Sequence, residues 1–295
     1  MTVMVALVGG QPLPNLLPAR YYRPGDVLLV YTQTTAQVFN RLKATLQKET
    51  TIHELESDAY NIVAIAKALN NKLEEPELAS HPLEFNLTGG TKAMALAAYQ
   101  VAQQRSAPIL YLESEGKQSR IYHYSWEHQQ LRASSSELLP EIVTLSDLLN
   151  VHLGPGEWVE QGPGHSEGSS FEIALAEALR SHGYEVMISI KAMNGQIDID
   201  VAVRFNNQYG IIEAKMGESG KKLDGIKQLS NAVRHLGTYA RTFYAINVPP
   251  ESAHEAIAIA SHIQIISLIN YTRGAKTLAP QDAEKLISIV DKALK

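Results

Sequence analysis

The sequence predicts an α/β protein with two α/β domains, and three observations support this. The first half alternates short apolar runs with helical patterns, the second half reads as helix, three-stranded meander, helix and strand, and a Gly- and Pro-rich passage at 153–164 interrupts the chain between them. A chain of 295 residues is long enough for two domains of ordinary size. We therefore expect a first domain at 1–140, a linker at 141–157 and a second domain at 158–295.

The first half has the order expected of a mostly parallel sheet with helices between its strands. The expected strands are residues 3–8, 27–31, 83–87 and 108–113, each an apolar run bounded by Gly, Pro or charge, and the expected helices are 35–47, 59–70 and 91–105. Residues 121–125 and 129–133 predict a closing antiparallel hairpin.

The second half begins with an expected helix at 169–182. Its expected strands are 185–191, 196–205, 208–215, 242–248 and 264–268, and its further helices are 222–236, 252–261 and 281–294. This order predicts an α/β sandwich.

Composition restricts the function. The net charge of -5 shows that the chain is not a bulk polycation, so any contact with nucleic acid must come from a local basic patch. The lack of cysteine excludes disulfides, thiolate zinc sites and a Cys nucleophile. No apolar segment approaches 18 residues, and the amino terminus lacks the basic region of a signal peptide. We expect no membrane association and a cytoplasmic location.

Two neighbouring strands carry acidic residues on one face. Asp198 and Asp200 share a face of the first strand, and Glu213 and Lys215 share a face of the second. Asn206 and Asn207 suit a two-residue turn, in which Phe205 pairs with Gln208. That register places Asp200 opposite Glu213 and Asp198 opposite Lys215, with Cβ atoms about 4.5–5.5 Å apart. Two carboxylates so close repel unless a cation lies between them, and the hairpin therefore predicts a metal site.

The helix before the hairpin opens with Ser169-Ser-Phe-Glu172. Taken alone, this S-x-x-E pattern favours a capping box in which Glu172 reaches back to Ser169. Beside the acidic hairpin, the favoured interpretation is that Glu172 leans from the first helical turn toward the acidic face of the sheet.

A helix Glu followed by Asp-x(12)-Glu-x-Lys across a hairpin resembles the PD-(D/E)XK nuclease family. The resemblance implies that two carboxylates, Asp200 and Glu213, and the main-chain carbonyl of Ala214 hold Mg²⁺ or Mn²⁺. Lys215 would orient or activate the attacking water. Glu172 matches the helix acid of the family and completes the candidate metal set. Hard oxygen ligands also suit a divalent metal that bridges phosphate and water.

Two positions qualify this resemblance. Gln228 matches a Gln often found on the next helix of the family, and we expect it at the catalytic site. Asp198 either replaces Asp200 as the metal ligand or pairs with Lys215, and the hairpin register favours Asp200. The Pro-Asp pair of the family name is missing, and a solvated charged sheet face is the alternative to a catalytic site.

The first half contains three polar loops at the ends of its strands. The stretch from Asn86 to Ala95 runs from a strand through Gly89-Gly90 into a helix, whose free amides would attract an anion. It lacks the Walker pattern, so ATP hydrolysis is not expected. The loops 9–15 and 32–35 would lie at the same carboxyl edge of a parallel sheet. Ordinary turns are the alternative, but three converging loops favour a binding pocket.

This half resembles the CARF domain, a Rossmann-like module that senses cyclic oligoadenylates in type III CRISPR immunity. The matching residues are the Gly9-Gly-Gln-x-Pro-x-Pro-Asn15 start, Thr32 after the second strand and the Leu87-Thr-Gly-Gly-Thr-Lys92 loop. A Rossmann-like CARF domain followed by a PD-(D/E)XK restriction-endonuclease-like α/β domain accounts for nearly the whole chain. It resembles the two-domain CRISPR ancillary nucleases that act as homodimers.

The resemblance implies a homodimeric nuclease of DNA or RNA that is switched on by a cyclic oligoadenylate, with cyclic tetra-adenylate as the expected activator. Lys92 and the amides of 89–91 would hold phosphates, while Thr32, Gln11 and Asn15 would contact sugar or base. The full expected ligand set is Gly10, Gln11, Asn15, Thr32, Thr88, Gly89, Gly90, Thr91 and Lys92.

Three other functions remain open at this point. In the first, a CARF protein only senses the ligand and uses a degenerate nuclease fold for docking or transcriptional control; the complete set Glu172, Asp200, Glu213 and Lys215 argues against this. A ring nuclease would degrade its own activator. A restriction-type endonuclease would cleave without any activator.

Overall fold

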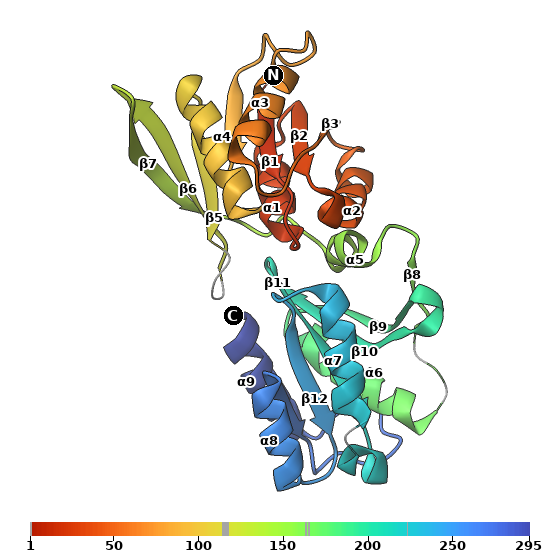
Figure 1. Ribbon diagram of the computed structural model, residues 1–295. Coiled ribbons are helices and arrows are strands. Elements are labelled where there is room, and N and C mark those ends of the chain that lie inside the picture. The colour runs from red at the N-terminus through yellow and green to blue at the C-terminus, as the bar shows by residue number, and fades with distance from the viewer. Residues whose placement is uncertain (1, 114–117, 163, 165, 223) are drawn as a thin grey trace. The chain divides into compact units, whose positions relative to one another are not determined.

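The computed structural model describes residues 2–113, 118–162, 164, 166–222 and 224–295. The chain divides into two compact units, Met1–Ile142 and Val143–Lys295 (Figure 1). The expected linker at 141–157 differs from the structure, because helix α5 (Leu145–Leu153) lies within it and is part of the second unit. Leu145 and Leu148 are buried there, and the indole of Trp158 donates a hydrogen bond to Asn150. Burial of this helix moves the boundary to about residue 142.

The first unit is a seven-stranded sheet with strand order β3-β2-β1-β4-β5-β6-β7. Strands β1 to β5 run parallel, and β5, β6 and β7 pair antiparallel. The bounds are β1 Val3–Leu7, β2 Asp26–Tyr31, β3 Thr51–Glu56, β4 Leu83–Asn86, β5 Ile109–Glu113, β6 Arg120–Glu127 and β7 Gln130–Leu138. The predicted alternation of strands and helices, and the closing hairpin, are confirmed.

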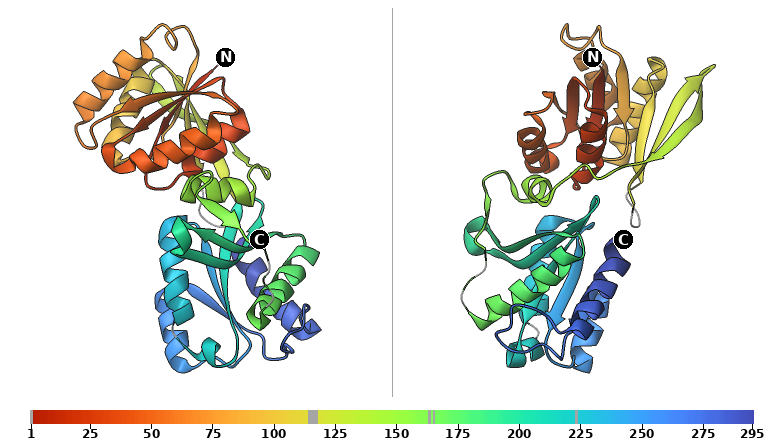
Figure 2. Two further views of the ribbon diagram at one scale, coloured as in Figure 1. Left: turned by 90° about the vertical axis from the view of Figure 1, so that its right-hand side faces the viewer. Right: turned by 180° about the vertical axis from the view of Figure 1, so that it is seen from behind.

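The helices of this unit cover both faces of its sheet, as Figure 2 shows. They are α1 Leu13–Tyr22, η1 Gln33–Thr35, α2 Ala36–Leu46, α3 Ile62–Leu73 and α4 Lys92–Gln104. Helices α1 and α2 contact each other, as do α3 and α4. Because the strand order reverses between β1 and β4, the loops after these strands open at one carboxyl edge, which is where α/β sheets bind ligands.

Helix α1 and strand β3 are absent from the sequence prediction, for different reasons. The prolines at 12, 14 and 18 indicate a loop, yet Pro14 lies in the first helical turn, where its missing N–H costs nothing. Pro18 lies inside the helix, and burial of Leu16 and Leu17 offsets the backbone hydrogen bond it removes. Strand β3 is at the sheet edge and contains too few apolar residues to be recognised.

The second unit is a six-stranded sheet with strand order β13-β12-β11-β10-β9-β8. Its strands are β8 Trp158–Glu160, β9 Glu185–Ala192, β10 Ile197–Phe205, β11 Gln208–Lys215, β12 Arg241–Ile246 and β13 Ile263–Ser267. Its helices besides α5 are α6 Glu167–Ser181, η2 Met193–Gly195, η3 Gly217–Lys221, α7 Asp224–Leu236, α8 Ser252–Ala260 and α9 Pro280–Leu294. Helices α6 and α9 pack together over one apolar face, and α5 packs against α7. No helix in the described parts of the chain is long and apolar enough to cross a membrane.

The predicted hairpin register is confirmed from Phe205 and Gln208 to Val201 and Ile212, around a turn in which Asn206 has a φ of 53°. The predicted pairing of Asp198 with Lys215 is wrong. The recorded pairs between β10 and β11 stop at Val201, and Asp198 pairs instead with Lys191 of β9. Beyond this point the Asp200 carboxylate accepts the Ala214 N–H, in the place of a main-chain ladder bond.

Candidate functional site

Four predicted residues come together in the second unit, at the point where β10 and β11 part. Glu172 comes from α6, Asp200 from β10, and Glu213 and Lys215 from β11. The ammonium of Lys215 lies 3.4 Å from Asp200 Oδ2 and forms an ion pair with Glu213 Oε1. Glu213 is only 3% exposed. The site is therefore a buried acidic cluster served by one lysine.

Glu172 is not a capping residue. The helix begins at Glu167 with Ser166 as its N-cap, so the alternative of a capping box with Ser169 is excluded. Glu172 lies near the acidic face, as expected, but it comes from the second helical turn and not from the first. Its Oε2 accepts a hydrogen bond of 3.1 Å from the Ser189 hydroxyl. Ser189 has a φ of 54°, a conformation that residues other than glycine adopt rarely. A strained strand residue thus holds the helix acid beside the cluster.

Burial dominates the electrostatics of this site. It raises the pKa of Glu213 to about 8 and that of Glu172 to about 7, and the neighbouring Asp200 adds to both shifts. Burial also raises the pKa of Asp200, although Lys215 and the Ala214 N–H oppose the shift. Desolvation opposes the charged form of Lys215, but Asp200 and Glu213 together raise its pKa. Three carboxylates share one ammonium, so the cluster lacks positive charge.

This donor set fits a divalent metal ion by its chemistry. Asp200 and Glu213 offer hard carboxylate oxygens. In an extended strand the N–H and C=O of one residue point to the same side, so the Ala214 carbonyl lies on the side of its N–H, which donates to Asp200 over 2.7 Å. Within the described residues, no three His, Asp or Glu side chains converge tightly enough to hold a metal by themselves. Main-chain carbonyl, water and phosphate oxygens would have to complete the coordination.

Gln228 is not brought into the cluster. It lies on α7 with an exposed side chain. Within the described part of the chain, no hydrogen bond joins it to Glu172, Asp200, Glu213 or Lys215. Its expected catalytic role remains a prediction without geometric support.

The raised acid pKa values predict how stability depends on pH. A carboxyl group whose pKa is raised by folding stabilises the protein fully below its unfolded value of about 4.3, and this contribution disappears as the pH rises through the folded value. For Glu213 and Glu172 the loss falls between about pH 4 and pH 8. We expect thermal unfolding of metal-free protein to show the melting temperature falling over this range. In Glu213→Gln the fall should be smaller, and an equal slope in the two proteins would contradict the assignment.

Two of the three polar loops of the first unit, those after β1 and β4, lie against each other. A Cβ atom at Gly89 would lie 2.1 Å from the Leu7 carbonyl oxygen, and one at Gly9 would lie 3.0 Å from the Gly90 nitrogen. Gly90 has a φ of 75°, in the left-handed region that favours glycine. The loop after β4 thus lies against the end of β1, and its glycines allow this close approach.

Asn15 has a different position from the one expected. It is completely buried, and its amide donates to the Leu7 carbonyl over 2.9 Å and accepts from the Asn86 amide over 3.3 Å. The hydroxyl of Thr88 donates to Asn86 and accepts from the Leu112 N–H. The side chains of Asn15 and Thr88 thus form hydrogen bonds that hold the loops, and the expected ligand contacts of these two residues stay predictions.

The remaining predicted ligand residues divide by exposure. Thr32 is 4% exposed and packs into the η1 turn, while Thr91 caps α4 and donates to the Ala59 carbonyl. Gly10 and Lys92 are exposed. The Oε1 atom of Gln11 is buried and has no hydrogen-bond partner among the described residues, and such an orphan acceptor requires a donor. Lys92 and the amides at the start of α4 therefore suit an incoming anion best, whereas Gln11 suits a hydroxyl or amino group that can donate a hydrogen bond.

Two supporting residues escaped the sequence prediction. Asn86 directly precedes the Gly89-Gly90 loop at a strand end, a position that in retrospect marks it as a loop anchor. Ser189 alternates with Ile188 and Ile190 like any other strand residue, and nothing local distinguishes it.

Comparison with known proteins supports the fold of each unit. Residues 3–139, nearly the whole of the first unit, match the sequence model of the Card1 CARF domain, which supports a CARF domain there. Can2 from Sulfobacillus thermosulfidooxidans, solved with cyclic tetra-adenylate, shares 16% identity at a TM-score of 0.75, over 99% of both chains. Protein VC1899 from Vibrio cholerae shares 14% at a TM-score of 0.72, over 99% of this chain and 98% of its own.

A third solved structure covers the same architecture. It is a type III CRISPR defence DNA nuclease activated by cyclic oligoadenylate, with 18% identity and a TM-score of 0.64, over 97% of this chain and 51% of its own. At these identities the likeness shows a shared fold. No curated protein matches the chain.

Proposed function

We propose that this protein is a metal-dependent nuclease of type III CRISPR defence, active as a homodimer and switched on by cyclic tetra-adenylate. One observation carries the proposal: the buried Glu213 and the partly buried Asp200 both form ion pairs with Lys215, and the partly buried Glu172 lies within range of the same ammonium. The second unit would then be a PD-(D/E)XK domain. The CARF domain and the likeness to Can2, which was solved with cyclic tetra-adenylate, support the activator. The likeness to a DNA nuclease supports the reaction class.

The residues of the site have distinct tasks in this proposal. Asp200, Glu213 and the carbonyl of Ala214 would hold Mg²⁺ or Mn²⁺, which when bound polarises the phosphate and lowers the pKa of a water. Lys215 lies beside both carboxylates, where it orients the attacking water and stabilises charge that develops on the phosphate. Glu172, with a pKa of about 7, is poised to accept or release a proton near neutral pH. Ser189 holds its carboxylate in place.

The activator site would lie at the carboxyl edge of the first sheet. The amides at the start of α4 and the exposed Lys92 offer positive potential to the phosphates of a cyclic oligoadenylate. Gln11 offers a buried acceptor for a hydroxyl or amino group. A ring with two-fold symmetry suits an isologous interface between two copies of the chain. The ligand activates only if it binds the cleavage-competent arrangement more tightly than the resting one.

The test is a cleavage assay in Mn²⁺ with supercoiled plasmid and single-stranded RNA, with and without cyclic tetra-adenylate. We expect cleavage only in the presence of the activator, and the cleaved substrate identifies the nucleic acid. Cleavage without activator would support the nuclease assignment and contradict activation by a cyclic oligoadenylate. Tight ligand binding with no cleavage would indicate a sensor that uses its second domain for docking. Loss of the intact ring during incubation would indicate a ring nuclease.

A further inference from the structure

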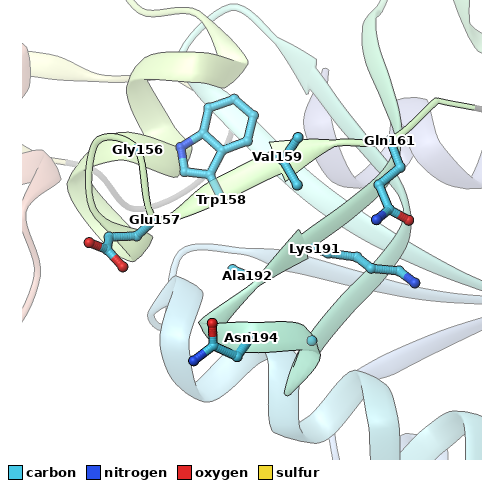
Figure 3. Close-up of a pocket in the computed structure, with 9 residues that line it drawn as sticks. Gly156, Glu157, Trp158, Val159, Gln161, Lys191, Ala192 and Asn194 are labelled. Atoms are coloured by element: carbon cyan, nitrogen blue, oxygen red, sulfur yellow. The ribbon is translucent and has the colours of Figure 1, made fainter.

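A pocket of about 370 Å³ lies beside the acidic cluster in the second unit, between β8, the end of β9 and the η2 turn (Figure 3). This volume is within the range of small-molecule sites. Its wall combines one ammonium, two carboxamides and an apolar strip. These are contributed by Lys191, Gln161, Asn194, Trp158 and Val159.

The pocket joins the acidic cluster through two short connections. The Gln161 N–H donates to the carbonyl of Ser189, and the hydroxyl of the same serine donates to Glu172. Lys191 is two residues beyond Ser189 in β9, which is a distance of about 7 Å along the strand. A group bound in the pocket would therefore lie about one nucleotide from a phosphate at the cluster.

The polar groups of the pocket are available to a ligand. Among the described residues, the carboxylate that pairs with Lys191 is that of Asp198, at 3.9 Å with both side chains largely exposed, and an ion pair of this kind contributes little. Figure 3 shows the side chains of Gln161 and Lys191 together at one end of the pocket. Those of Asn194 and Glu157 lie at the other end, so the only carboxylate of the wall is kept away from the ammonium.

The wall is also held rigidly. The indole N–H of Trp158 donates to Asn150 over 2.9 Å, which fixes the ring against α5. Met193, Asn194 and Gly195 are three consecutive residues with positive φ, of 50°, 55° and 84°. Two of these are not glycine, and conformations of this kind occur preferentially at functional sites. A pre-formed pocket loses less conformational entropy when it binds a ligand.

We infer that this pocket binds the unpaired base of the nucleotide next to the cleaved phosphodiester, with Lys191 on the adjoining phosphate and with Gln161 and Asn194 at opposite edges of the base. The inference rests on the proposed nuclease function and specifies its substrate as single-stranded. Aromatic and apolar walls accept the flat face of a base, and carboxamides offer both a donor and an acceptor to its edge. A paired base cannot enter such a pocket without leaving its stack.

The test measures binding separately from cleavage. Glu213→Ala protein with cyclic tetra-adenylate is titrated, by fluorescence anisotropy, into labelled single-stranded DNA and RNA oligonucleotides that carry one abasic residue at successive positions. One position should weaken binding about tenfold when its base is missing. Adding Gln161→Ala should weaken binding of the intact oligonucleotide by a similar factor. In that variant a missing base should cause no further loss of affinity. Adding Lys191→Ala should weaken all oligonucleotides and reduce the salt dependence by about one unit of slope.

Lys276→Ala is the matched control, since this exposed lysine of the same unit is outside the pocket wall, and it should leave affinity unchanged. Circular dichroism verifies that each variant is folded. The absence of any abasic penalty, equal binding of duplex, or no oligonucleotide binding at all would overturn the subsite. Binding with an abasic penalty but no cleavage by the wild type would retain the subsite and overturn the nuclease. Activated cleavage by the wild type without an abasic penalty would support the nuclease and overturn the subsite.

Discussion

Replacing Glu213 by Ala should reduce activated cleavage about a thousandfold while leaving the affinity for cyclic tetra-adenylate unchanged. Such a fall corresponds to about 4 kcal/mol of lost transition-state stabilisation, which is in the range of a missing metal contact. Glu213 is buried and paired with Lys215, so its removal leaves Asp200 as the main carboxylate partner of that ammonium. The proposed activator site belongs to the other compact unit. Cleavage rates and isothermal titration with the activator measure the two quantities.

The matched control is Glu177→Ala. Glu177 is on the same helix as Glu172, is exposed and forms an ion pair with Arg180 over 2.9 Å, so its removal should leave cleavage within about twofold. Glu213→Gln keeps the size of the side chain and separates loss of the carboxylate from loss of packing. Retention of cleavage in both Glu213 variants, or a joint loss of cleavage and ligand affinity, would contradict two separate sites.

Gly89→Ala should destabilise the first unit by at least about 3 kcal/mol and abolish binding of cyclic tetra-adenylate. Its Cβ atom would lie 2.1 Å from the Leu7 carbonyl oxygen, which is main chain of a buried strand and has no freedom to move aside. The loop after β4 would have to leave the end of β1, and the amides at the start of α4 would move with it. Thermal unfolding and ligand titration measure the two effects.

Gly10→Ala is the corresponding control. A Cβ atom at Gly10 would meet nothing within 4 Å, and the residue is exposed at the same edge of the sheet. We expect its unfolding free energy to change by less than about 0.5 kcal/mol. If Gly89→Ala proved as stable as Gly10→Ala and bound the ligand normally, the loop would not be packed on β1 in the way described.

The sequence predicted those parts of the fold that depend on neighbours along the chain. The hairpin register follows from two-residue alternation and from Asn206, which adopts the left-handed φ that the turn requires. The same alternation failed at Asp198, because the ladder ends where the Asp200 side chain replaces a main-chain acceptor. Helix α1 was not predicted because prolines disfavour a helix by local rules. The burial of Leu16 and Leu17 nevertheless stabilises the helix in the folded protein.

The candidate sites divide in the same way. The sequence identified Glu172, Asp200, Glu213 and Lys215 as one group, because their spacing on a helix and a hairpin is visible in the chain itself. It misplaced Asn15 and Thr88, because polar residues in a loop look alike whether they face a ligand or support the loop. Only the contacts of these side chains distinguish the two roles.

By itself the sequence determined the residue types at the two sites, the hairpin register from Phe205 and Gln208 to Val201 and Ile212, and the glycines that allow β1 and the loop after β4 to meet. Only the tertiary structure decided which polar atoms are used internally and which stay available, as the orphan acceptor of Gln11 shows. It also decided the raised pKa values of Glu172 and Glu213 and the pocket beside Lys191. The physical reason is that desolvation and concavity arise only when α6, β8, β9 and β11 pack together, and local sequence patterns do not report that packing.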